Sequence, residues 1–175
     1  MEGFKKSNFK MIKMDLQYTI PAQTSIGHVH LKVSDLKRST DFYCGLLGFE
    51  ITGQYGDEAA FISAGGYHHH IALNTWYTKG SPQADKNAVG LLHTAILYPT
   101  KRDLAVIYSR LKTSQYPLTG CADHGVSYAL YLDDPDGNGV ELYWDRPMEQ
   151  WPRRENGSVE MYTKQLDLAD LLDEL

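Results

Sequence analysis

The order of secondary-structure signals between Ile26 and Trp144 occurs twice, and this repeat constrains the fold more than any other feature. A strand-like alternation is followed by a helical pattern and three short strand-like segments, and the same order returns after the turn-rich loop 79–90. A unit of this size cannot bury both faces of its sheet alone, so we expect the two units to pack together. The sequence therefore predicts an α+β fold built from paired βαβββ modules.

The first module is expected over about residues 25–78. Its opening strand, Ile26–Val33, alternates apolar residues with a face that carries His28 and His30. Asp35 is expected to cap a helix that Gly48 ends. The three strand candidates that follow are Glu50–Gln54, Glu58–Ala64 and Tyr67–Trp76.

The second module is expected over about residues 88–147. A strand that includes His93 leads into an amphipathic helix over about Lys101–Thr113, and His93 falls 65 residues after His28. The last two strands are joined by DPDGNG, which favours a tight hairpin turn. The three strand candidates are Leu118–Ala122, Tyr128–Leu132 and Gly139–Trp144.

Two segments flank this domain of residues 25–147. Residues 1–24 are interpreted as an N-terminal arm, and they lack the apolar stretch of a secretory signal or membrane anchor. Residues 148–175 form a C-terminal extension, with a strand predicted near Val159–Thr163 and a helix near Leu166–Leu172.

The charge and the cysteines narrow the class of protein. A net charge of −5 argues against nucleic acid or an anionic membrane as a partner. Cys44 and Cys121 lie in no zinc-type cluster, and two reduced thiols fit a cytoplasmic protein.

Three residues form a candidate metal site. His28 and His93 occupy matching first strands, and Glu141 lies on the last strand of the second module. Two imidazoles and a carboxylate can bind one face of a metal ion and leave other positions open. His30 points the same way as His28 and competes with it, although alignment of the repeats favours His28.

The segment from Ile26 to about Pro147 resembles the vicinal oxygen chelate superfamily, which includes glyoxalase I, bleomycin-binding proteins, fosfomycin-modifying thiol transferases and extradiol dioxygenases. IGHVHLKVSDLKRSTDFYCGLLGFE looks like its opening strand and helix, and LLHTAILYP and DPDGNGVELY match its second histidine and its glutamate. The resemblance implies modules that form a curved mixed sheet around a metal-binding cavity. It assigns the metal ligands to His28, His93 and Glu141.

A longer motif resembles the signature of the extradiol dioxygenases, and the later segment DRPMEQWPRRENGSVEMY resembles bacterial catechol 2,3-dioxygenase-like proteins. His124, Leu130-Tyr131, Asp134-Pro135-Asp136-Gly137 and Glu141 match the spacings of the extradiol signature, and only Ala122 departs from it. The resemblance implies an Fe(II)-dependent dioxygenase, with Mn(II) or another divalent metal as a substitute. It would open the ring of a small aromatic diol with O2. His124 would form a hydrogen bond to a substrate oxygen, and Tyr131 would steady a substrate or intermediate oxygen. The protein is expected to form a homodimer.

Some alternatives stay open. Glyoxalase I and the epimerases resemble this chain but take a further Glu or Gln ligand from the last strand of the first module, where Ile71, Ala72, Leu73 and Asn74 offer no carboxylate. A metal-dependent glyoxalase- or thiol-transferase-like enzyme and a non-catalytic small-molecule-binding resistance protein remain as alternatives. In the run His68-His69-His70, His70 is the candidate substrate contact, and the distal acid of the reaction is not identified.

Overall fold

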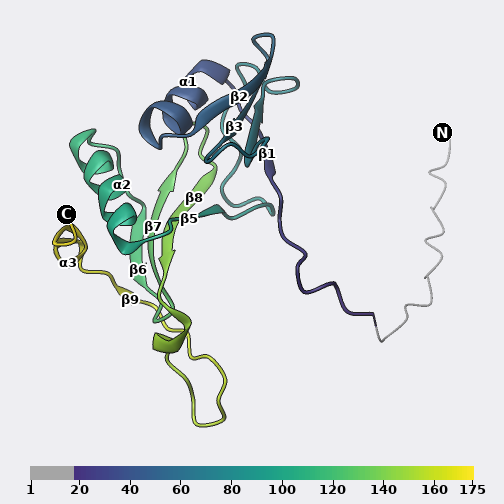
Figure 1. Cartoon of the computed structure of the whole chain (residues 1–175). Helices are drawn as coiled ribbons and strands as arrows, with labels where there is room; N and C mark the ends of the chain where they lie inside the picture. The colour runs from purple at the N-terminus through teal and green to yellow at the C-terminus, as the bar shows by residue number, and fades with distance from the viewer. Residues whose placement is uncertain (1–17) are drawn as a thin grey trace.

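A computed structural model describes residues 18–175, and its strands form two separate mixed sheets (Figure 1). The α+β class and the paired βαβββ modules are confirmed, but the strands do not make one continuous curved sheet. The first sheet has the order β1-β4-β3-β2, with β1 (Val29–Lys32), β2 (Glu50–Tyr55), β3 (Ala59–Ser63) and β4 (Ile71–Asn74). The second has the order β5-β8-β7-β6-β9, with β5 (Thr94–Leu97), β6 (Gly120–Asp123), β7 (Ser127–Asp133), β8 (Gly139–Asp145) and β9 (Lys164–Gln165). The expected arm of residues 1–24 lies largely outside the described residues.

The helices begin where the sequence predicts. Asp35 caps α1 (Leu36–Thr40) by accepting a hydrogen bond from the Arg38 backbone N–H at 3.0 Å, and the helix continues as a π-helical segment, η1 (Asp41–Leu46). Thr100 caps α2 (Lys101–Thr113), whose bounds match the prediction. The remaining helical segments are η2 (Met148–Gln150) and α3 (Leu168–Leu172). None of the helices in residues 18–175 is long and apolar enough to cross a membrane.

Two predicted strands differ from the structure. The strand expected at Tyr67–Trp76 begins only at Ile71, because Gly65 and Gly66 form a turn with positive φ angles and the three histidines after it lie in an irregular segment before β4. The strand expected at Val159–Thr163 is replaced by β9, which pairs with the edge of β6.

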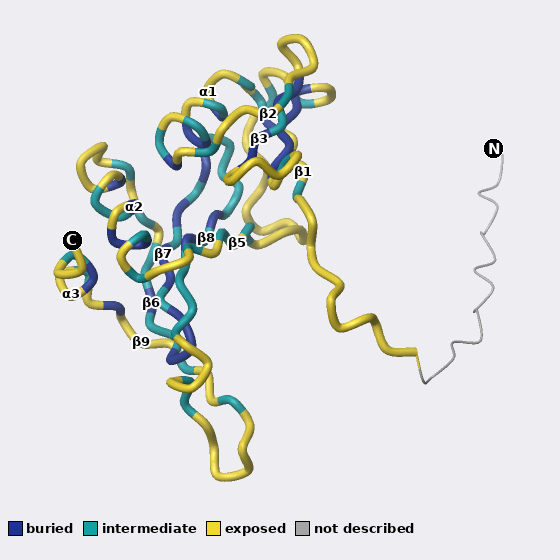
Figure 2. The backbone as a smooth tube through the Cα atoms, in the orientation of Figure 1, coloured by how far each residue is buried: buried dark blue, intermediate teal, exposed yellow. Residues whose placement is uncertain are grey.

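One apolar core runs through both modules (Figure 2). It is closed by α1, η1 and α2 on the helical side and by Leu166 and Leu171 of the C-terminal extension. The largest fully buried apolar side chains include Tyr43, Ile62, Leu73, Leu104, Leu111, Leu130, Leu132 and Leu142. Burial of this kind is the main stabilising contribution to a fold of this size.

The turn between β7 and β8 fastens the second module to the first. The buried Asp134 carboxylate accepts a hydrogen bond from the Tyr43 hydroxyl at 3.1 Å. The Asp136 carboxylate accepts from the Ser34 hydroxyl and from the Arg38 guanidinium, each at 2.6 Å. The Tyr43–Asp134 bond is buried and the Ser34–Asp136 bond is partly buried, so these contacts hold the modules in one relative placement.

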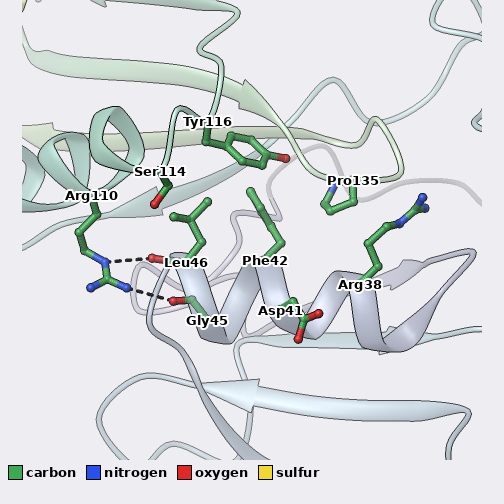
Figure 3. A pocket seen from close by; sticks show the side chains of 9 residues that line it. All are labelled: Arg38, Asp41, Phe42, Gly45, Leu46, Arg110, Ser114, Tyr116 and Pro135. Atoms are coloured by element: carbon green, nitrogen blue, oxygen red, sulfur yellow. Dashed lines mark hydrogen bonds between the residues drawn. The ribbon is translucent and has the colours of Figure 1, made fainter.

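A second junction lies beside it on the helical side. Arg110 of α2 donates from Nε to the Leu46 carbonyl at 3.1 Å and from Nη2 to the Gly45 carbonyl at 3.0 Å (Figure 3). A cavity of about 420 Å³ lies there, lined in part by Phe42 and Tyr116. The helical sides of the two modules therefore meet at this junction. The edge strands β1 and β5 belong to different sheets.

Candidate metal and catalytic site

The register of the second sheet assembles most of the candidate site. Tyr131 of β7 lies directly opposite Glu141 of β8, and Glu141 is paired on its other side with Ala95 of β5. His93, just before β5, places Nε2 at 2.9 Å from Glu141 Oε2. Three of the predicted residues therefore meet across neighbouring strands.

Gly139 allows the close approach that sets His93 in place. A Cβ atom at this position would lie 2.1 Å from the Leu92 carbonyl oxygen and 3.1 Å from His93 Cβ. Only glycine can bring β8 this near to the residues that precede β5.

The Tyr131 hydroxyl stands between two partners. It lies 3.1 Å from Glu141 Oε1 and 2.7 Å from His124 Nε2. Partial burial, with a contribution from the Glu141 carboxylate, raises the pKa of Tyr131 to about 12. The hydroxyl consequently keeps its proton at neutral pH and acts as a donor.

The second nitrogen of His124 is held by the C-terminal extension. Nδ1 lies 3.0 Å from the Tyr162 backbone carbonyl and 3.3 Å from the Thr163 hydroxyl. Because a carbonyl can only accept, Nδ1 carries the hydrogen of that bond. In a neutral His124, Nε2 then has no hydrogen and accepts a hydrogen bond from the Tyr131 hydroxyl.

The hydrogen bonds that join His124, Tyr131 and Glu141 also have a second arrangement. If Nε2 of His124 also carries a hydrogen, it donates to the Tyr131 oxygen, and the Tyr131 proton turns to Glu141. The residues can thus pass a proton along one line. The supporting contact at Tyr162 was missed from the sequence, since a backbone carbonyl leaves no signature there.

His28 is not part of this group within one chain. It lies just before β1, exposed, with its ring centroid 4.5 Å from that of His69. Among residues 18–175 no three His, Cys, Asp or Glu side chains come together to hold a metal ion. The predicted triad is only partly assembled, because β1 and β5 are edge strands of different sheets.

The choice between His28 and His30 can now be argued from contacts. The Asn74 amide and His30 Nε2 lie 2.7 Å apart, and the Trp76 ring packs edge-on at 5.7 Å. His28 has no hydrogen bond to any residue that the structure describes, so its ring nitrogens are available to a ligand.

The run of three histidines is divided by the turn. His70 accepts at Nδ1 from the Ala64 backbone N–H at 3.3 Å and lies 2.9 Å from the Ser63 hydroxyl, so the predicted substrate contact is engaged in local structure. His69 is the member that lies beside His28. Burial, and then the neighbouring imidazoles of His28 and His68, lower the pKa of His69.

The repeat also shows where the further Glu or Gln ligand of glyoxalase I would lie in the first module. His30 of β1 pairs with Ala72 of β4 as Ala95 of β5 pairs with Glu141 of β8. Ala72 is buried and supplies no donor atom.

The donor types suit a divalent transition metal, since imidazole nitrogen and carboxylate oxygen are its common ligands. His93 and Glu141 face each other and fit such an ion. One chain supplies two of the three predicted donors at this place.

Known proteins resemble the chain over the same region. The sequence profile of the Glyoxalase/Bleomycin resistance protein/Dioxygenase superfamily matches residues 25–142. The catechol-2,3-dioxygenase of Bacillus subtilis (strain 168) is 37% identical over 160 residues, which are 89% of this chain and 54% of that protein. Biphenyl-2,3-diol 1,2-dioxygenase 3 of Rhodococcus globerulus is 35% identical over 121 residues, 69% of this chain and 63% of that protein. The chain therefore spans less than two thirds of the length of these relatives.

Solved structures agree on the fold. A glyoxylase/bleomycin resistance protein/dioxygenase domain from Frankia sp. EAN1pec has a TM-score of 0.60 at 25% identity, over 71% of this chain and 94% of that one. A glyoxalase/dioxygenase from Nostoc punctiforme has a TM-score of 0.58 at 16% identity, over 74% and 99% of the two chains. With its repeated βαβββ modules and these matches, the chain belongs to the Glyoxalase/Bleomycin resistance protein/Dioxygenase superfamily.

Proposed function

We propose that the protein is an Fe(II)-dependent extradiol dioxygenase that opens the ring of a catechol-type aromatic with O2. The observation that carries the proposal is the line from His124 through Tyr131 and Glu141 to His93, with successive distances of 2.7, 3.1 and 2.9 Å. The curated relatives, dioxygenases of catechol and of biphenyl-2,3-diol, support the substrate class.

Each residue of the line suits a separate task. His93 and Glu141 would hold the ion, which when bound supplies a Lewis acid and a source of electrons for O2. Tyr131, whose pKa of about 12 keeps it protonated, would donate a hydrogen bond to a diol oxygen as negative charge develops there. His124 Nε2 would accept or return the proton that passes through Tyr131.

The first module would supply the remaining groups. His28 is the proposed third ligand, because its ring is free of hydrogen bonds to the described residues. His69 replaces His70 as the proposed acid-base group, since it lies beside His28 while His70 is bonded to Ser63 and Ala64. Two free cysteines, Cys44 and Cys121, support a cytoplasmic setting as part of the proposal.

The test is reconstitution of the purified chain with Fe(II) under anaerobic conditions, followed by a panel of catechols and air. We expect O2 uptake matched by absorbance of a ring-opened product, and weaker turnover after loading with Mn(II). Tyr131→Phe should lower the rate, whereas Tyr128→Phe on the same strand is the matched control because Tyr128 packs against Trp144 outside the site.

Two outcomes would contradict the proposal. Binding of the diol without O2 uptake would indicate a small-molecule-binding protein. Metal-dependent addition of a thiol to an electrophile, with no ring-opened product from any catechol, would indicate the transferase branch.

A further inference from the structure

The dipeptide Asn-Gly occurs twice in the chain, in two different settings. Asn138-Gly139 lies where the turn after β7 enters β8, and Asn156-Gly157 lies in the C-terminal extension. Asparagine before glycine is prone to spontaneous deamidation, because glycine has no side chain to hinder attack by its own backbone nitrogen on the preceding carboxamide. The surroundings of each pair decide whether that attack can occur.

Asn138 is held by three hydrogen bonds to Asp134. Its Nδ2 donates to Asp134 Oδ2 at 2.9 Å, and its backbone N–H donates to Oδ1 at 2.8 Å. Its carbonyl accepts from the Asp134 backbone N–H at 2.8 Å, and Asp134 is buried. The carboxamide therefore cannot turn toward the Gly139 nitrogen without leaving a buried carboxylate short of a donor.

Asn156 lies instead in the turn of a short hairpin whose residues 153–158 are exposed (Figure 2). The Gly157 N–H donates to the Arg154 carbonyl at 2.9 Å, and a single bond of this kind in an exposed turn opens readily. Asn156 Oδ1 accepts from the Ser158 backbone N–H at 3.0 Å and from the Ser158 hydroxyl at 2.7 Å. Both donors draw electrons away from the carboxamide carbon and so favour attack on it, whereas Nδ2, the leaving group, has no hydrogen-bond partner among the described residues.

We propose that Asn156 is a site of spontaneous deamidation, and that isoaspartate there loosens the segment that holds His124. The Gly157 nitrogen forms a bond to Asn156 Cγ, the bond from Cγ to Nδ2 breaks, and the Gly157 proton leaves with Nδ2 as ammonia. Water then opens the resulting succinimide ring at either carbonyl carbon and gives aspartate or isoaspartate. No oxidant or reductant takes part, and the isoaspartate product has a longer main chain.

The hairpin leads directly to the support of His124. A hydrogen bond from the Glu160 N–H to the Pro152 carbonyl, at 2.8 Å, closes its base. Next along the chain, Tyr162 donates from its N–H to the His124 carbonyl at 3.2 Å and accepts from His124 Nδ1 at 3.0 Å. Pro152 and Tyr162 also pack closely against Gly125, where a Cβ would lie 2.9 and 2.7 Å from them. A longer main chain at the turn would shift this hairpin and weaken the pair of bonds between Tyr162 and His124.

The site itself is tested by peptide mapping of the purified full chain after storage in mildly alkaline buffer. We expect the peptide with Asn156 to gain the mass that separates an acid from an amide and to accept methyl groups from a protein isoaspartyl methyltransferase. The peptide with Asn138 should stay unchanged. Asn156→Gln is the matched control, because its longer side chain would have to close a larger ring. An unmodified Asn156, or modification of Asn138 at the same rate, would refute the site.

The effect on His124 is tested by hydrogen exchange at the Tyr162 backbone N–H. Exchange should be faster in the isoaspartate form than in fresh protein. It should stay slow in fresh Asn156→Asp protein, which gains the same charge without a longer main chain. A kinetic readout, which rests on the proposed function, follows on Fe(II)-loaded protein: kcat should fall in proportion to the isoaspartate fraction while Fe(II) affinity is kept, and stored Asn156→Gln protein should lose neither.

Hydrogen exchange separates this inference from the proposed function. Faster exchange at Tyr162 in a protein that turns over no catechol, whether fresh or stored, would leave the inference standing and refute the dioxygenase. Unchanged exchange at Tyr162 in chains that carry isoaspartate at position 156 would refute the link to His124. An active protein whose kcat is the same in the isoaspartate form would refute that link as well.

Discussion

Replacing Gly139 with alanine tests how His93 is positioned. The added Cβ would lie 2.1 Å from the Leu92 carbonyl oxygen, so the backbones must part by at least about 0.9 Å to reach 3.0 Å, below which Cβ contacts are essentially never seen. His93 follows Leu92 directly, and its own Cβ would be only 3.1 Å away. The distance of 2.9 Å between His93 and Glu141 would open by a similar amount.

A displacement of this size has a measurable consequence. A misplacement of about 1 Å at a catalytic centre costs roughly 10²-fold in rate, and overpacking a core costs about 1–3 kcal/mol in stability. We expect Gly139→Ala to weaken Fe(II) binding and to lower kcat/KM by about 10²-fold while the chain stays folded.

The assay is Fe(II) titration with steady-state kinetics and thermal melting on the same preparations. Gly53→Ala is the control: it also lies in a strand, β2, and its Cβ would meet its nearest neighbour, the Phe61 ring outside the site, at an ordinary 3.7 Å. Wild-type affinity and rate in a folded Gly139→Ala protein would refute this account of the site.

Four other changes probe separate parts of the molecule. Tyr131→Phe should keep Fe(II) binding but reduce kcat by about 10²-fold or more, as steady-state kinetics on Fe(II)-loaded protein would measure. Gly125→Ala, whose Cβ would lie 2.7 Å from the Tyr162 ring at a positive φ, should likewise lower kcat with Fe(II) retained, because it displaces the carbonyl that holds His124. Asp134→Ala should lower the free energy of unfolding by roughly 3 kcal/mol in urea, since its buried donors lose their acceptor. Burial raises the pKa of Tyr116 to about 12, so stability should hold below pH 10 and fall between about pH 10 and 12; Tyr116→Phe should flatten that fall in alkaline unfolding curves.

Local chemistry made the second module predictable. The helical spacing gave the bounds of α2, and the turn sequence after Asp133 joined β7 to β8. Once that hairpin forms, its register alone sets Tyr131 opposite Glu141. The residues of the hairpin are therefore enough to predict that these two side chains lie close together.

The placement of the modules was not predictable in the same way. It depends on contacts between residues far apart in the chain, such as Ser34 with Asp136, 102 positions later. Nothing in either segment marks the other as its partner. A sequence can thus suggest three ligands without revealing whether one chain brings them together.

The histidine run shows a different limit. Alternation assigns His68 and His70 to one face only if the strand has already begun, and the turn at Gly65-Gly66 delays it to Ile71. His69 therefore lies next to His28, and His70 bonds to Ser63. The side-chain period of a strand predicts contacts only within the strand's true bounds.

The two modules, although repeated, contribute unequally to the proposed chemistry. The second carries His93, Glu141, Tyr131 and His124 in one connected line, and the first has Ala72 where the second has Glu141. A metal site therefore cannot form from the first module alone. Its contribution is reduced to one exposed imidazole beside a second, and the fold presents these at an open edge. Because the contacts of Asp134 with Tyr43 and of Asp136 with Ser34 fix the two modules relative to each other, that edge is held away from the hydrogen-bonded residues of the second module.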